Sequence, residues 1–211
     1  MGADAAPISF TTTQFVASTA ASTSTLADAD NATNPPTSLP LISDSTVFDA
    51  DNFASGTAVA AAGLLSTSAD VTSTSGFASG IGSAEFIGTF TPVLPLVDLS
   101  IGFSSSDFTS GATAFSAGSL FVSLASGGST LFQQIFTTSG PISQIITVPL
   151  GKPATLDILL TSEADVLTGG SASNTALATF TATGAAPEPA TLALLGIGVA
   201  GLAASRRRKL N

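Results

Sequence analysis

Short apolar runs separated by Gly, Ser, Asn and Pro recur along most of the chain between Val47 and Thr183. Several alternate cleanly, as in residues 155–160, where apolar side chains occupy one face of an extended chain. Such runs, rich in β-branched and aromatic side chains, are typical of half-buried strands. The clearest cover residues 85–91, 97–103, 119–124, 130–138, 142–148, 154–161 and 176–182. They predict an all-β body, an antiparallel β-sandwich or jelly-roll.

Residues 1–46 form a leading region with a different texture. Residues 8–16 alternate in the same way and predict a leading strand, which passes into a Ser/Thr/Ala stretch. Asn34-Pro35-Pro36 and Pro40 then predict a turn or exposed loop. The Ala-rich segment 57–65 leaves helix and strand open, because Gly63 and the flanking Thr weaken a helix.

Residues 187–211 differ from the body, residues 1–186. Pro187-Glu188-Pro189 precedes an uncharged apolar stretch, 190–205, and a basic cluster of Arg206, Arg207, Arg208 and Lys209. A helix over 190–205 rises about 24 Å, enough to cross a bilayer of roughly 30 Å if the Arg and Lys side chains snorkel. The stretch is apolar on all sides, which favours a transmembrane helix over a buried core helix. The basic cluster stays cytoplasmic, placing the body outside and arguing against a tail anchor with a cytosolic body.

This order of Pro-Glu-Pro, apolar span and basic cluster resembles the sorting signal of PEP-CTERM proteins. The resemblance implies export from a Gram-negative bacterium and cleavage near the motif by an exosortase, a membrane protease. Pro187, Glu188 and Pro189 would be the recognition motif, and Arg206, Arg207, Arg208 and Lys209 the cytoplasmic retention cluster. The body would pass from an inner-membrane intermediate to the cell surface, or to an extracellular biofilm matrix of exopolysaccharide.

An exported protein of this family is expected to begin with a signal peptide. No basic region followed by an apolar stretch precedes the first predicted strand, whereas Ala3-Asp4-Ala5 resembles the remnant of a cleavage site. We therefore expect the start of this sequence to be truncated.

The amino-acid composition excludes several classes of function. The chain has no His and no Cys, which excludes a Ser-His-Asp triad, a thiolate nucleophile, disulfides and Cys-type zinc sites. Lys152 is the one basic residue of the body, and the whole chain has a net charge of −9. The acidic body therefore repels the phosphate backbone of nucleic acids, and no nucleic-acid partner is expected. Lys152 itself is interpreted as a loop cation between two strands. These features predict a protein that is not an enzyme.

The acidic residues contain one repeated tetrapeptide, Asp28-Ala29-Asp30-Asn31 and Asp49-Ala50-Asp51-Asn52. Each copy would place two carboxylates and an amide oxygen in one short loop, which suits Ca²⁺. Neither copy continues into an EF-hand loop, and two solvated Asx-type turns are the alternative. The candidate calcium ligands are Asp28, Asp30, Asn31, Asp49, Asp51 and Asn52, and no other cofactor is expected.

Two functional hypotheses follow. The leading one is an exported, non-catalytic protein of the cell surface or extracellular matrix. The alternative is a secreted carbohydrate-binding or carbohydrate-active module that uses Asp and Glu, with or without calcium. Edge strands with few charges also predict self-association. Gly127-Gly128 and Gly169-Gly170 are interpreted as hairpin turns.

Overall fold

Side chains that alternate between buried and exposed positions form strands throughout the described chain. The computed structural model describes residues 6–33 and 40–185. In β12 (Ala154–Val166), every second side chain is buried, among them Leu156 and Ile158. Because successive side chains of a strand point to opposite faces, this pattern gives each strand one face for a core.

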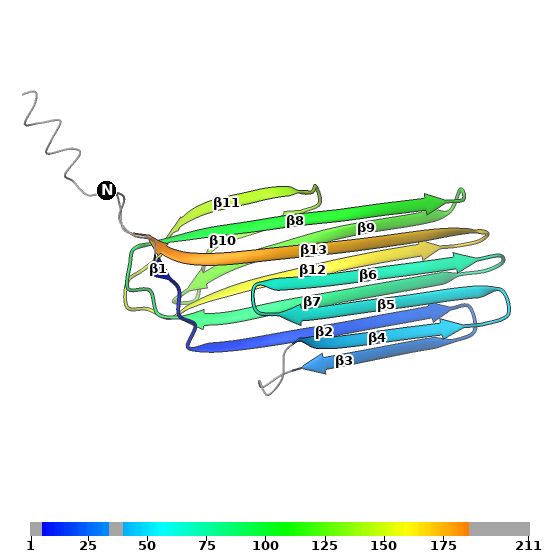
Figure 1. Cartoon of the computed structure of the whole chain (residues 1–211), viewed down its shortest axis with the longest axis horizontal. Coiled ribbons are helices and arrows are strands. Elements are labelled where there is room, and N and C mark those ends of the chain that lie inside the picture. Colours follow the sequence, from blue (N-terminus) through cyan, green and yellow to red (C-terminus); the bar gives the residue numbers. More distant parts are fainter. Residues whose placement is uncertain (1–5, 34–39, 186–211) are drawn as a thin grey trace, which may run out of the picture.

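The strands form two antiparallel sheets packed face to face (Figure 1). The seven-stranded sheet has the order β11-β8-β13-β6-β5-β4, with β1 on β13. The six-stranded sheet has the order β10-β9-β12-β7-β2-β3. The strands of the first are β1 (Ala6–Pro7), β4 (Leu41–Phe48), β5 (Asn52–Ala61), β6 (Leu64–Ser73), β8 (Leu96–Ser110), β11 (Gly140–Thr147) and β13 (Gly170–Ala185). Those of the second are β2 (Thr12–Thr23), β3 (Ala27–Thr33), β7 (Ala78–Phe90), β9 (Ala114–Ser126), β10 (Ser129–Phe136) and β12.

The predicted antiparallel sandwich is confirmed, and each of the seven clearest runs lies mainly in a strand. Residues 57–65, left open between helix and strand, belong to β5, a tight turn and β6. The strands extend well beyond the apolar runs, as β8 shows by continuing through a serine-rich stretch to Ser110. The predicted transmembrane helix, 190–205, lies outside the described residues. Within them, no helix is long and apolar enough to span a membrane.

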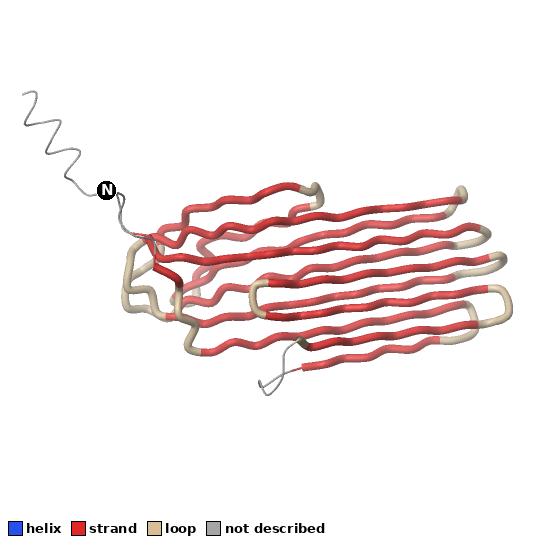
Figure 2. The backbone as a smooth tube through the Cα atoms, in the orientation of Figure 1, coloured by secondary structure: helices blue, strands red, loops and turns tan. Residues whose placement is uncertain are grey.

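Both chain termini of the described sandwich lie at one end, which we call the proximal end (Figure 2). β1 pairs with the last residues of β13, Ala6 opposite Gly184, and loops 91–95 and 148–153 close this end. The opposite, distal end carries the turns 24–26, 49–51 and 167–169. The interpretation of Gly169-Gly170 as a hairpin turn is wrong, because this turn carries the chain from the six-stranded to the seven-stranded sheet. Gly127 and Gly128, both at positive φ, do form a hairpin between β9 and β10.

The core changes along the sandwich. Toward the proximal end it is built from large side chains such as Phe86, Leu156 and Leu120. Toward the distal end a second cluster consists mainly of Ala and Val, including Ala54 and Val71. The two sheets lie close together at the distal end, where the core side chains are small. In the middle of the sandwich, buried hydroxyl groups link the two sheets, as in the 2.7 Å hydrogen bond between Thr67 and Ser162.

Candidate functional site

The strand that leads toward the predicted sorting motif is held firmly in the seven-stranded sheet. β13 pairs with β6 on one side and β8 on the other, and its last residue, Ala185, lies opposite Leu96. The predicted recognition motif, Pro187, Glu188 and Pro189, and the basic cluster of Arg206 to Lys209 lie outside the described residues. The last described strand therefore ends at Ala185, two positions before Pro187.

The first acidic tetrapeptide lies in a strand, so its prediction as a loop is wrong. Asp28 and Asp30 share one face of β3, and this face is turned toward β4 of the other sheet. The backbone N–H of Thr46 donates to Asp28 Oδ2 at 3.3 Å, and the Ser43 hydroxyl donates to Asp30 Oδ2 at 3.3 Å. Asn31 lies on the opposite face of the strand, because successive residues alternate. The two carboxylates close the seam between the sheets at their edge.

The second tetrapeptide forms the turn between β4 and β5. Asp49 Oδ1 accepts hydrogen bonds from the backbone N–H of Asp51 at 3.1 Å, and from that of Asn52 at 2.9 Å. The Asn52 side-chain amide donates to the same oxygen, at 2.9 Å. The backbone N–H of Asp51 is the main reason that the pKa of Asp49 is lowered to about 2. This is the Asx-type turn foreseen as the alternative to calcium binding.

The calcium assignment of the two tetrapeptides stays a prediction. In residues 6–33 and 40–185, no group of three or more His, Cys, Asp or Glu side chains is placed to hold a metal ion. The Oδ1 atom of Asp49 instead accepts hydrogen bonds within its own turn, and the carboxylates of Asp28 and Asp30 accept hydrogen bonds from β4 of the other sheet.

A carboxyl pair that the sequence reasoning missed lies on the outer face of the six-stranded sheet. Glu85 of β7 is opposite Leu159 of β12, which places it diagonally next to Asp157. Burial raises the pKa of both carboxyl groups, and the charge of Asp157 raises that of Glu85 further. The alternation of 155–160 put Asp157 on this face, but only the register between β7 and β12 reveals its partner. The two acids can share a proton.

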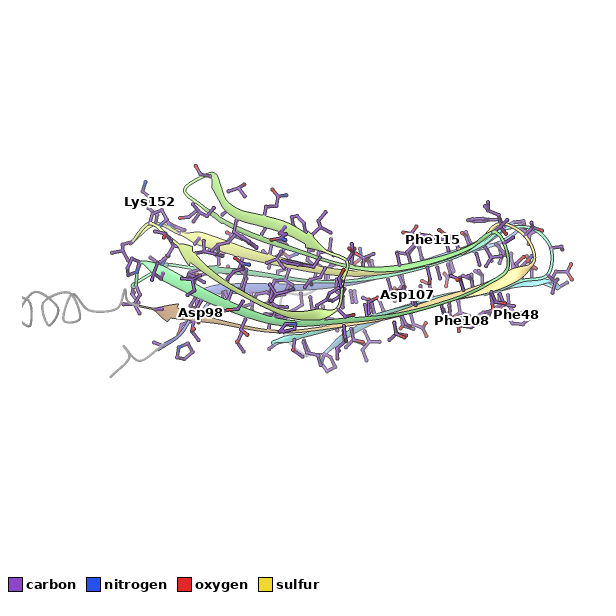
Figure 3. All side chains as sticks on the ribbon, turned by 90° about the horizontal axis from the view of Figure 1, so that it is seen from above. Phe48, Asp98, Asp107, Phe108, Phe115 and Lys152 are labelled. Carbon is purple, nitrogen blue, oxygen red and sulfur yellow. The ribbon has the colours of Figure 1, made fainter. Side chains whose placement is uncertain are left out.

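The proximal end combines apolar loops with the one basic side chain of the described residues. Lys152 lies in loop 148–153, between β11 and β12, as predicted. Figure 3 shows Lys152 and Asp98 toward this end, and Phe48, Phe108 and Phe115 toward the other. A cavity of about 230 Å³ opens between loop 91–95 and β1, lined mainly by apolar residues such as Ile8, Leu94 and Val97.

The described architecture is that of a two-sheet antiparallel β-sandwich. Residues 185–209 match the PEP-CTERM protein-sorting motif. The match begins at Ala185, the final residue of the last described strand, and the motif implies an exported protein that an exosortase processes and that is sorted to the cell surface.

Two of the solved structures similar to this chain are of carbohydrate-binding modules. TmCBM61 in complex with β-1,4-galactotriose is 10% identical, with a TM-score of 0.25 over 57% of this chain and 81% of its own. A structure of carbohydrate-binding modules from the β-sandwich superfamily is 9% identical, with a TM-score of 0.23 over 81% of this chain and 91% of its own. Similarity at this level carries no argument about a ligand. No curated protein matches the sequence.

Proposed function

We propose that the chain is a non-catalytic protein of the cell surface or extracellular matrix, delivered by exosortase cleavage at Pro187-Glu188-Pro189. The observation that carries this proposal is the position of the sorting motif, which begins at residue 185, where β13 ends at Ala185. Cleavage after this point releases the sandwich without cutting a strand or exposing its core.

Exopolysaccharide is the matrix partner that we propose. On the outer face of the seven-stranded sheet, Ser106, Thr175, Ser68 and Thr57 lie side by side on four neighbouring strands. Hydroxyl groups both donate and accept hydrogen bonds, as sugar hydroxyls do, so such a row can match a polysaccharide without any charge. The neighbouring row adds Ser104 and Ser66.

Intact mass spectrometry of the protein from its native host tests the sorting step. We expect the envelope and culture-fluid fractions to contain a species that ends near Pro187 and lacks Arg206 to Lys209. Replacing Pro187, Glu188 and Pro189 together by Ala should leave a full-length species in the envelope. Glu163→Ala, which removes an acid from the sandwich surface, is the control and should be processed normally. A full-length wild-type species in the membrane would contradict the proposal.

A further inference from the structure

Two loops at the proximal end are tied into one surface. The backbone N–H of Gly151 donates to the Pro92 carbonyl at 3.2 Å, and that of Val148 donates to the Pro95 carbonyl at 2.8 Å. These bonds join loop 91–95 to loop 148–153. Each loop presents one exposed aliphatic side chain, Val93 with 86% and Leu150 with 57% of its surface accessible. The surface thus carries two exposed apolar side chains, Val93 and Leu150, and the hydrogen bonds between the loops fix the distance between them.

Charge is distributed unevenly along the sandwich. Lys152, the one basic side chain among the described residues, belongs to this surface. Asp98, Glu85 and Asp157 are the acids nearer the proximal end. The remaining described acids lie toward the distal end: Asp28, Asp30, Asp44, Asp49, Asp51, Asp70, Asp107, Glu163 and Asp165. A negatively charged membrane surface therefore repels the distal end of the sandwich more strongly than the proximal end.

The length of chain after the sandwich identifies what this surface faces. β13 ends at Ala185, and the uncharged apolar stretch begins at residue 190. An extended residue spans at most about 3.5 Å, so the start of this stretch lies within roughly 20 Å of Ala185. Once the apolar stretch enters a bilayer, the proximal end is the part of the sandwich next to the lipid.

We propose that loops 91–95 and 148–153 dock on the phospholipid surface before cleavage, with Val93 and Leu150 in the interfacial layer and Lys152 at lipid phosphates. This rests on the proposed function for the membrane-inserted intermediate. Exposed aliphatic and basic side chains are the combination that binds anionic lipid surfaces. Docking holds the long axis of the sandwich away from the membrane and keeps residues 187–189 at the interface, where a membrane protease can reach them.

A single tryptophan tests the proposal, because the chain has no Trp and no Tyr. The full-length Val93→Trp protein is reconstituted into vesicles of phosphatidylethanolamine and phosphatidylglycerol with brominated acyl chains. We expect its emission to shift to shorter wavelength and to lose intensity by bromine quenching. Leu167→Trp, at an exposed position of the distal end with 62% of its surface accessible, is the control and should remain unquenched.

A second pair of variants separates docking from mere proximity. Leu150→Asp and Lys152→Gln, each placed in the Val93→Trp protein, leave the connection to the apolar stretch intact, and both should reduce quenching. Unchanged quenching in both would mean that the short connection alone brings Val93 to the lipid, and would overturn docking. Flotation with the vesicles distinguishes the two proposals. A protein that floats but shows no quenching at position 93 refutes docking alone, whereas a protein that does not float refutes the membrane intermediate as well.

Discussion

Asp49 shows how one carboxylate organises two turns at the distal end. Its Oδ1 atom accepts the hydrogen bonds that shape the turn between β4 and β5, and its Oδ2 atom accepts one from the Thr25 hydroxyl at 2.9 Å. Thr25 lies in the turn between β2 and β3 of the other sheet. The ionised side chain therefore links the two sheets where their core is made of small residues.

We expect Asp49→Ala to lower the melting temperature at neutral pH. The pKa of Asp49 in the folded protein, about 2, is below the ordinary value of 3.8. A lowered folded-state pKa stabilises the fold above the unfolded-state pKa, and the effect is lost as the pH falls through the folded-state value. The difference in melting temperature between wild type and variant should thus shrink between about pH 4 and pH 2.

Asp51→Ala is the matched control, because it removes a neighbouring carboxylate whose side-chain contact is the Ser75 hydroxyl at 3.5 Å. It should have a smaller effect. A difference between wild type and Asp49→Ala that stays constant over this pH range would contradict the role given to the ionised carboxylate.

At the scale of the element, the sequence reveals strands where side chains are large and misses them where they are small. The apolar side chains of 154–161 alternate visibly, and β12 follows. In β5, four of the five buried positions hold Ala54, Gly56, Ala58 and Ala60, and the fifth holds Asn52. The pattern therefore lacks large apolar side chains, and its Ala residues also favour a helix. What decides for a strand is the facing sheet, which comes so close that only small residues fit. The pairing of Glu85 with Asp157 also depends on register, which one strand's pattern does not contain.

A substitution at Gly56 tests how closely the two sheets approach each other. A Cβ atom at this position would lie 2.1 Å from the carbonyl oxygen of Ile81 in the facing sheet. We expect Gly56→Ala to destabilise the protein by about 1–3 kcal/mol, the usual cost of overpacking a core. Chemical denaturation measures the change.

The control for Gly56 is Gly102→Ala, which makes the same change within a strand of the seven-stranded sheet. Its Cβ atom would meet only the hydroxyl of Thr179, at 2.9 Å, which can rotate away. This variant should be nearly neutral. Equal stability of both variants would show that the sheets can separate at Gly56 without cost.

At the scale of the whole molecule, the two long edges of the sandwich differ. β3 and β4 form one edge and β10 and β11 the other (Figure 1). The first carries Asp28, Asp30 and Asp44, and the Asp28 carboxylate accepts the Thr46 N–H. The second has no charged side chain in either strand and exposes Ile135 and Ile145, at 63% and 66%. Charges at an edge oppose pairing with another chain, so we expect self-association at the β10/β11 edge.

Sedimentation over a wide range of protein concentration measures this self-association. Ile135→Lys should shift the protein toward the monomer, because a charge on an edge strand opposes pairing. Ile42→Lys on β4, at a position with 62% exposure, is the matched control and should leave association unchanged. A wild-type protein that is monomeric at every concentration would refute the expectation.

The central place of β13 in its sheet also determines how the proposed membrane-anchored intermediate responds to mechanical force. A pull on the C-terminal connection acts at Ala185, along the axis of a strand 16 residues long. β13 is bonded to β6 and β8 on its two sides, and these hydrogen bonds run across the direction of the pull. The load is therefore shared by both ladders in shear and does not open one bond after another. A sandwich tethered in this way can bear force from fluid flow or from neighbouring molecules while its strands stay paired.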